Sequence, residues 1–198
     1  MAAMRNTEPP RRSRLLIGIG ALAVVLVLGI VGVLALGGDD DDGADADTSP
    51  LPLAPRAGRM IEQSRIGATI RKPRRWAHRR GERSLTLRSP DRSVIMSVSL
   101  PPGAGRSAAV LQTGVAAIRR QYRGVKVITT DTRRVAGLRA ISVVTAATNA
   151  RGVTLRVLTS APQGRTRAWL VQVFSAAGAS EKRLAEAQVA IGTLRLTG

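Results

Sequence analysis

Reactive and aromatic side chains are scarce in this sequence: its 198 residues include no cysteine, one histidine, one tyrosine, one phenylalanine and two tryptophans. The absence of cysteine excludes disulfides and a lipid-modified N-terminal cysteine, so an exported domain would depend on its core alone. A single histidine, His78, leaves too few good ligands for a zinc site. So few aromatic rings also offer little surface for stacking bases, which disfavours nucleic acid as the partner.

Carboxylates are also rare beyond residue 55, where only six occur: Glu62, Glu82, Asp91, Asp131, Glu181 and Glu186. A Ser-His-Asp arrangement would have to use His78, which lies in a run of arginines. Their positive field disfavours the imidazolium that such a base must form. We therefore expect a non-enzymatic protein with no catalytic residue, no metal site and no cofactor. Glu181 and Glu186 are expected on the solvated face of the last helix.

One long apolar run marks the N-terminal part of the chain: residues 15–36 are 22 consecutive uncharged residues. At about 1.5 Å per residue, a helix of this length is roughly 33 Å long, enough to cross a hydrocarbon core of about 30 Å. Residues 1–14 carry four arginines, whereas residues 37–55 hold six aspartates and neither lysine nor arginine. The positive-inside rule then predicts a cytoplasmic basic tail over 1–14, a transmembrane helix over 15–36, and a C-terminal domain outside the cell membrane.

The same N-terminal part also fits a cleaved signal peptide, with Ala35-Leu36-Gly37 as a small-x-small cleavage site. Apolar regions of signal peptides are usually about 7 to 15 residues long, so the longer run favours a retained anchor. Both interpretations export the rest of the chain, and whether the anchor is cleaved stays open.

Residues 37–58 are first acidic and then rich in proline, with too few apolar residues to form a core. We interpret them as a disordered linker that lifts the following domain off the bilayer. The four consecutive aspartates at 39–42 could bind a divalent cation, but nothing there fixes a coordination geometry, so a solvated spacer is preferred. Residues 59–198 have the usual size of one domain, and we expect a single extracytoplasmic domain there.

Alternating apolar residues predict about seven strands in this domain. The predicted strands cover residues 66–71, 84–88, 94–100, 125–130, 141–148, 153–157 and 169–173. Helical spacing predicts one helix after Ser107 and a second after Ser180, each serine acting as the N-cap. Tight turns between strands favour antiparallel pairing. We therefore expect an α+β domain, a largely antiparallel sheet covered by two helices, preceded by the transmembrane helix.

Four short motifs lie between or at the ends of these elements: Pro73-Arg-Arg-Trp76, Ser89-Pro-Asp91, Val135-Ala-Gly-Leu-Arg-Ala140 and Leu194-Arg-Leu196. In this order they resemble PsbP-like domains over most of residues 60–198. The resemblance implies an α-β-α sandwich, in a group that includes the photosystem II subunit PsbP and many exported bacterial proteins. It brings no catalytic residues, so it implies an architecture and nothing about chemistry.

Positive charge is the most prominent property of the domain, since 27 of the 31 lysines and arginines lie beyond residue 55. The densest run forms the candidate anion-binding site: Arg71, Lys72, Arg74, Arg75, Arg79, Arg80 and Arg83. The planar guanidinium matches phosphate and carboxylate groups, and Trp76 is a candidate apolar or cation–π surface beside it. Because arginine is also frequent elsewhere in the domain, a diffuse basic surface without a specific ligand remains the other interpretation.

These observations predict a single-pass membrane protein that presents a basic, non-catalytic binding or structural domain outside the membrane. Its expected partners are anionic lipid headgroups, cell-wall polyanions or an acidic protein. Nucleic acid is a weaker candidate, because the predicted orientation places the domain outside the cytoplasm. The alternative function is an exported small-molecule-binding domain with an apolar pocket between sheet and helix, lined by residues such as Leu111, Val115 and Trp169.

Overall fold

The computed structural model describes residues 58–198. The predicted basic tail, the predicted transmembrane helix and nearly all of the predicted linker lie outside these described residues. Between residues 58 and 198, no helix is both long enough and apolar enough to cross a membrane.

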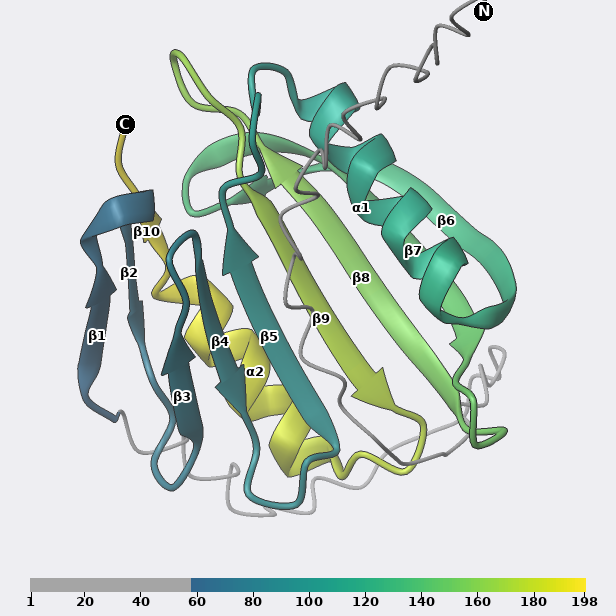
Figure 1. Ribbon diagram of the computed structural model, residues 1–198. Helices are drawn as coiled ribbons and strands as arrows, with labels where there is room; N and C mark the ends of the chain where they lie inside the picture. Colours follow the sequence, from purple (N-terminus) through teal and green to yellow (C-terminus); the bar gives the residue numbers. More distant parts are fainter. Residues whose placement is uncertain (1–57) are drawn as a thin grey trace, which may run out of the picture.

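Ten strands, two α-helices and one short 3-10 turn follow one another along the described chain (Figure 1). The first elements are β1 (Met60–Gln63), the 3-10 turn η1 (Ser64–Ile66), β2 (Ala68–Arg71), β3 (Ala77–Arg80), β4 (Ser84–Arg88), β5 (Val94–Ser99) and α1 (Ser107–Gln121). They are followed by β6 (Arg123–Val135), β7 (Leu138–Thr148), β8 (Thr154–Pro162), β9 (Leu170–Ala176), α2 (Glu181–Gly192) and β10 (Arg195–Leu196).

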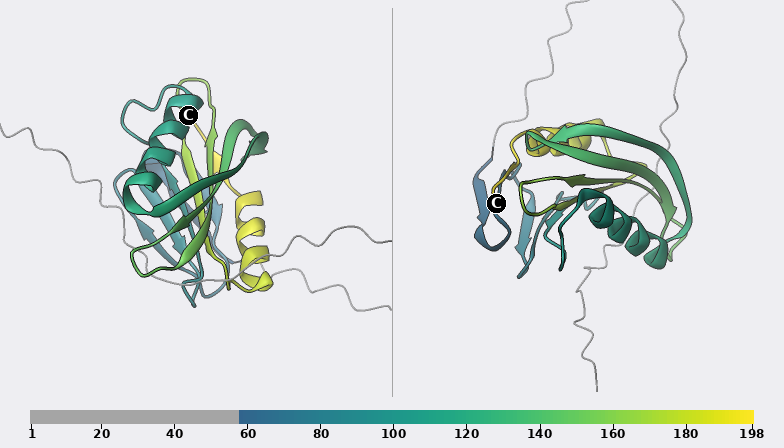
Figure 2. Two further views of the ribbon diagram at one scale, coloured as in Figure 1. Left: turned by 90° about the vertical axis from the view of Figure 1, so that its right-hand side faces the viewer. Right: turned by 90° about the horizontal axis from the view of Figure 1, so that it is seen from above.

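Seven of the strands form one antiparallel sheet in the order β3-β4-β5-β9-β8-β7-β6, so β3 and β6 are its edges. The strands β1, β2 and β10 form a separate small sheet. The two helices lie on opposite faces of the large sheet, as the view from above makes clear (Figure 2). The prediction of an α+β domain with two helices and a large antiparallel sheet is confirmed.

Alternation of side chains along the strands divides the core between the two faces of the large sheet. On the face toward α2, Met96 of β5 and Val171 of β9 belong to one apolar cluster with Ala187 of the helix. On the face toward α1, Val157 of β8 belongs to another cluster with Ile118 of that helix. Each of these five side chains is at most 3% exposed. The shared apolar faces predicted for these strands are therefore confirmed.

Three strands were not predicted, and one predicted strand has a different place. The segment predicted as a strand at 66–71 begins in the 3-10 turn, and only Ala68–Arg71 is extended, because Gly67 reverses the chain with φ of 61°. This strand, β2, pairs with β1 and β10 rather than with the large sheet. The edge strand β3 escaped prediction because Ala77–Arg80 has no alternating apolar residue.

One of the two predicted N-cap residues, Ser180, is at the cap position, and the other, Ser107, is not. Arg106, not Ser107, is the N-cap residue of α1, and Ser107 lies inside the helix. The backbone N–H and the hydroxyl of Ser107 both donate to Oε1 of Gln163, at 2.8 and 2.9 Å. Ser180 is the N-cap residue of α2, but its side chain makes no capping hydrogen bond. A long-range partner therefore replaces the local cap at the start of α1.

Candidate anion-binding surface

The turn between β2 and β3 carries the first part of the arginine run, and Trp76 holds it in place. The Trp76 side chain is only 2% exposed, and its indole N–H donates to Oε2 of Glu186 at 2.7 Å. The backbone N–H of Trp76 donates to the Pro73 carbonyl, and Nζ of Lys72 donates to the Trp76 carbonyl at 2.6 Å. These contacts fix a turn that presents Arg74 and Arg75 to solvent.

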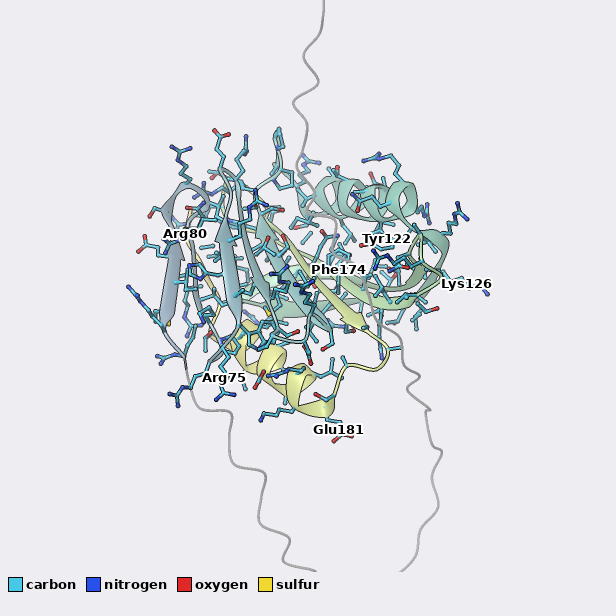
Figure 3. All side chains as sticks on the ribbon, turned by 60° about the horizontal axis from the view of Figure 1, so that its bottom comes forward. Arg75, Arg80, Tyr122, Lys126, Phe174 and Glu181 are labelled. Carbon is cyan, nitrogen blue, oxygen red and sulfur yellow. The ribbon has the colours of Figure 1, made fainter. Side chains whose placement is uncertain are left out.

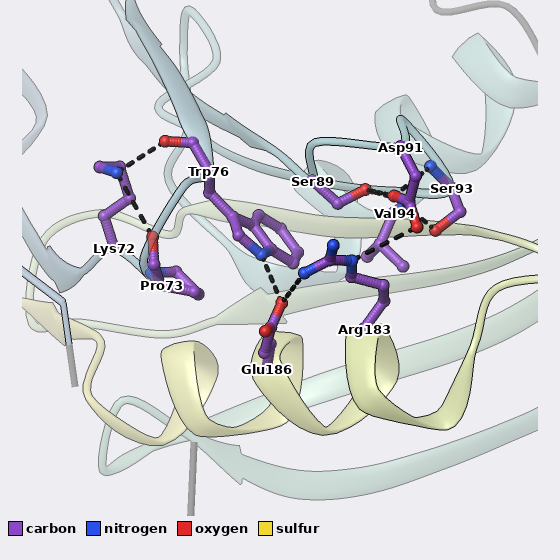
Figure 4. A network of polar contacts seen from close by, with 9 residues as sticks. All are labelled: Lys72, Pro73, Trp76, Ser89, Asp91, Ser93, Val94, Arg183 and Glu186. Carbon is purple, nitrogen blue, oxygen red and sulfur yellow. Dashed lines mark hydrogen bonds and ion pairs between the residues drawn. The ribbon is translucent and has the colours of Figure 1, made fainter. Parts of the chain in front are cut away.

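Glu186 corrects the prediction of a fully solvated helix face, because it is only 9% exposed. Besides the indole of Trp76, it accepts a hydrogen bond from Arg183 one turn earlier on α2, at 2.8 Å. Arg183 also reaches Oδ2 of Asp91 at 3.3 Å, so one guanidinium joins two carboxylates (Figure 4). The hydrogen bond to Glu186 and, secondarily, the contact with Asp91 raise the pKa of Arg183. Glu181 is exposed, as predicted.

Asp91 organises the loop between β4 and β5. Its Oδ1 accepts hydrogen bonds from the hydroxyls of Ser89 and Ser93 and from the Ser93 backbone N–H, at 2.6 to 3.1 Å. Partial desolvation acts to raise the pKa of Asp91, but these hydrogen bonds and Arg183 together outweigh it and lower the pKa to about 2. The carboxylate therefore stays charged, and the predicted Ser89-Pro-Asp91 turn is tied to α2.

Three of the seven predicted site residues make hydrogen bonds with the rest of the protein, two of them through the side chain. At Arg71 only the backbone N–H is bonded, and it donates to Oγ1 of Thr193. Nζ of Lys72 donates to the Pro73 and Trp76 carbonyls. The Arg83 guanidinium donates to the Leu100 carbonyl at 2.9 Å and to the Pro101 carbonyl at 3.2 Å. Lys72 and Arg83 thus use side-chain hydrogen-bond donors to hold local structure.

The other four residues of the run are spread around the β3 edge of the sheet. Arg74 and Arg75 precede the strand, whereas Arg79 and Arg80 end it, and Figure 3 shows Arg75 and Arg80 well apart. Consecutive strand residues point to opposite faces. Arg80 therefore lies on the same face of the sheet as its β4 partner Leu85. Arg79 lies on the opposite face, together with its β4 partner Thr86. The arginine run therefore surrounds the β3 edge of the sheet and does not form a single patch on one face.

The four guanidinium groups of Arg74, Arg75, Arg79 and Arg80 make no ion pair and no hydrogen bond with residues 58–198. Where carboxylates of the described chain do meet arginines, the partners are Arg65, Arg133 and Arg183. Most of the positive charge of the domain is thus left without an opposite charge nearby, and it is available to an outside anion.

Trp76 is not a binding surface for a cation or an anion, because its ring is buried beneath the turn. The cation–π contact in the described chain lies elsewhere, with Cζ of Arg167 5.2 Å from the ring centroid of Trp169. His78 is exposed on β3. Within residues 58–198, no three His, Asp or Glu side chains gather in a way that would hold a metal ion.

The residues suggested for an apolar pocket belong to different parts of the core. Leu111 and Val115 of α1 belong to a cluster on one face of the large sheet. Trp169 belongs to the cluster on the other face, and its indole N–H donates to the Ile66 carbonyl at 2.7 Å. These three side chains therefore do not line one common pocket.

Comparisons with known proteins support the fold alone. No family model matches the chain. The serine/threonine-protein kinase PkaB of Streptomyces coelicolor is 44% identical over 52 residues, which make up 26% of this chain and only 12% of the kinase. The solution structure of cyanobacterial PsbP (CyanoP) from Synechocystis is 13% identical, with a TM-score of 0.51, and covers 78% of this chain and 98% of that one.

A crystal structure from Bacteroides thetaiotaomicron is 14% identical, with a TM-score of 0.50, and covers 71% of this chain and 49% of that chain. At these identities a structural likeness carries no information on ligands. The fold is PsbP-like, as the sequence motifs predict, and the chemistry of the surface must be argued from this chain's own residues.

Proposed function

We propose that this protein is a single-pass membrane protein whose PsbP-like domain binds polyanions outside the membrane through the arginines at the β3 edge. The observation that carries the proposal is the set of four exposed guanidinium groups, Arg74, Arg75, Arg79 and Arg80, that have no partner within residues 58–198. Exposed arginine retains its charge at any physiological pH and matches phosphate or carboxylate groups in pairs.

The rigidity of the edge also supports binding. Arg74 and Arg75 stand on a turn held by the buried indole of Trp76, and Arg79 and Arg80 stand on a strand paired with β4. Charged groups on a fixed framework lose less conformational entropy when an anion binds than the same groups on a loose segment do. A long-range positive field from the remaining basic residues would draw polyanions toward this edge.

The placement outside the membrane is supported by the sequence: a 22-residue apolar run with arginines before it and aspartates after it. For a domain placed outside the membrane, the proposed partner is an anionic lipid surface, a cell-wall polyanion or an acidic protein. The proposal is non-catalytic, because the single histidine lies on the exposed strand β3, which contains no carboxylate.

The proposal is tested with the soluble piece 56–198, whose core clusters all lie within the described residues. A cooperative thermal transition first establishes that the piece is folded. Binding to anionic vesicles and to heparin is then measured against neutral vesicles over a salt series. The variant with Arg74, Arg75, Arg79 and Arg80 all changed to glutamine is compared with one in which four distant arginines, Arg119, Arg120, Arg133 and Arg134, are changed in the same way.

Salt-sensitive binding to either anionic probe, lost in the first variant and largely kept in the second, is the expected result, because screening weakens exposed charge pairs. If both variants lose binding equally, binding depends on the total positive charge of the surface. This result would contradict a site at the β3 edge. Absence of binding to both probes at low salt would contradict polyanion binding altogether.

A further inference from the structure

One face of the large sheet is covered only in part. Helix α1 contacts chiefly β8 and β7, with fewer contacts to β6 and β9. In Figure 1 the strands β3, β4 and β5 lie uncovered beside α1, while α2 lies behind them. The uncovered area is defined here as the open face. Its floor is made of the side chains of β3, β4, β5 and β9 that point toward the α1 side.

The strand register places a row of polar side chains across the open face. Arg79 is opposite Thr86, Thr86 opposite Ser97, and Ser97 opposite Gln172. Neighbouring strands are about 4.8 Å apart, so this row is roughly 14 Å long. Thr86, Ser97 and Gln172 are all half-buried. The hydroxyls of Thr86 and Ser97 make no hydrogen bond to other side chains of residues 58–198, and Gln172 makes only a long one, at 3.5 Å.

Two neighbouring rows complete the floor. One contains Ser84 and Ser99, and the other contains Arg88, whose β5 partner is the apolar Ile95. Next to Ile95 in this second row lies Phe174, which stacks with Tyr122 at the end of α1 with 6.2 Å between the ring centroids. Arg88 was not part of the predicted site, although its alternation with Thr86 and Ser84 in the sequence marks it as a member of the polar face.

The charge of the open face has one sign. None of β3, β4, β5 and β9 contains an aspartate or a glutamate. The face carries the guanidinium groups of Arg79 and Arg88, neither of which has an ion-pair partner in the described chain. Such a floor offers positive charge and hydrogen-bonding groups together, and none of its four strands contributes a negative charge.

We propose that the open face binds an extended acidic polysaccharide, with Arg79 and Arg88 meeting its carboxylates and Thr86, Ser97 and Gln172 meeting its hydroxyls. The proposal rests on the polyanion binding proposed above and assigns it a ligand class and a face. A row of polar groups on a flat floor matches a chain that repeats charges and hydroxyls along its length. The partly buried rings of Phe174 and Tyr122 add apolar surface at one end of the floor.

The shape of this region favours a narrow polymer over a membrane. A helix with its side chains is about 10 Å across, so α1 stands up from the sheet beside the floor. A planar bilayer would rest on α1 and stay away from Thr86 and Ser97. A single extended polymer chain can lie along the floor next to the helix and reach all three rows.

The test uses the full chain in neutral detergent micelles, with oligogalacturonate as the acidic probe and dextran of similar length as the neutral one. Arg79→Gln is compared with Arg156→Gln, which removes the same charge from an exposed arginine of β8 on the opposite face of the large sheet. A second pair compares Ser97→Glu, in the centre of the floor, with Thr113→Glu, on the exposed side of α1. Melting temperatures are recorded for every variant.

The expected result is salt-sensitive binding of oligogalacturonate, no binding of dextran, and affinity about fivefold weaker in Arg79→Gln with less than a twofold change in Arg156→Gln. Ser97→Glu should weaken binding at least tenfold, whereas Thr113→Glu should have a small effect. Equal losses in Arg79→Gln and Arg156→Gln, with binding intact in Ser97→Glu, would overturn the open face while leaving polyanion binding standing.

Two further outcomes would also overturn the proposal. Dextran bound as tightly as oligogalacturonate would mean that charge plays no part. The face would be assigned to lipid if oligogalacturonate does not bind and if Arg79→Gln weakens binding to anionic vesicles by the expected factor. If neither oligogalacturonate, heparin nor anionic vesicles bind, the proposed function itself fails, and this result differs from each of the others.

Discussion

Single polar side chains decide how the basic turn is held. Glu186 is buried because the indole of Trp76, 110 residues away in sequence, supplies a donor for its carboxylate. Helical spacing alone places an isolated glutamate toward solvent, so the sequence could not reveal this contact. Trp76, which the sequence offered as a surface beside the arginines, is instead a core residue. Contacts of this kind depend on the fold and not on local pattern.

Changing Glu186→Gln should lower the free energy of unfolding by about 1 to 3 kcal/mol, because Trp76 and Arg183 lose a charged acceptor in a buried setting. Glu181→Gln, on the exposed side of the same helix, is the matched control and should cost less than about 0.5 kcal/mol. Chemical denaturation of both variants gives the comparison. Equal and small effects would mean that the network of Figure 4 adds no stability.

The lowered pKa of Asp91 gives a pH dependence with a definite sign. The group has a pKa of about 2 in the folded state against an ordinary 3.8, so the folded state favours the ionised form. The stabilisation is present above about pH 4 and is lost as the pH falls toward 2. The side chain is 44% exposed, so solvent screening reduces the contribution to about 1 kcal/mol.

Denaturation curves at pH 6 and pH 2.5 measure this contribution. The unmodified protein should lose more stability between the two pH values than Asp91→Asn does, by about 1 kcal/mol. Parallel loss in the two proteins would show that Asp91 titrates without affecting folding.

At the scale of elements, the hairpin between β6 and β7 combines a correct prediction with a local cost. The turn predicted at 135–140 is present, with Val135 paired to Leu138 across a two-residue loop. Both loop residues have positive φ, 55° at Ala136 and 78° at Gly137. Glycine adopts this conformation freely, but an alanine there crowds its Cβ against the backbone.

Ala136→Gly should therefore stabilise the domain by about 1 kcal/mol, through relief of this conformation. The same substitution at Ala108, on the exposed face of α1, should destabilise it by about 1 kcal/mol, because glycine lowers helix propensity. The two variants carry an identical chemical change, and thermal melts should show opposite shifts. Shifts of the same sign would mean that loss of the contact between the Ala136 methyl group and the core outweighs relief of the backbone conformation.

Elements with a strong periodic pattern were predictable, and the others were not. The central strands β4 and β5 have clear alternation, and their predicted bounds agree with the structure within about a residue. The strand β3 consists of Ala-His-Arg-Arg and buries nothing, so no apolar pattern marks it. Its pairing with β4 places neighbouring arginines of the run on opposite faces of the sheet. The candidate surface could therefore be located in sequence, but its division between the faces required the structure.

The whole molecule has far more positive than negative charge, with a formal net charge of +18. Repulsion among like charges disfavours the compact state, and it is reduced when salt screens the charges. The melting temperature should therefore rise by a few degrees between about 10 mM and 300 mM sodium chloride. Differential scanning calorimetry measures this shift. A fall in melting temperature would mean that the ion pairs around Arg183 outweigh the general repulsion.

The large sheet ends in two unpaired edges, and unpaired edges invite a second sheet to add itself. On β6 the strand register is irregular near Lys126, and this irregularity disrupts the row of backbone groups with which another strand could pair. On β3, the like charges of the exposed Arg79 and Arg80 would oppose the approach of a second copy. A polyanion that neutralises these arginines therefore also removes the barrier to self-association at that edge. If the proposed polyanion binding holds, several domains gathered along one polymer would meet at β3 first, and occupancy of the site would lower the solubility of the domain.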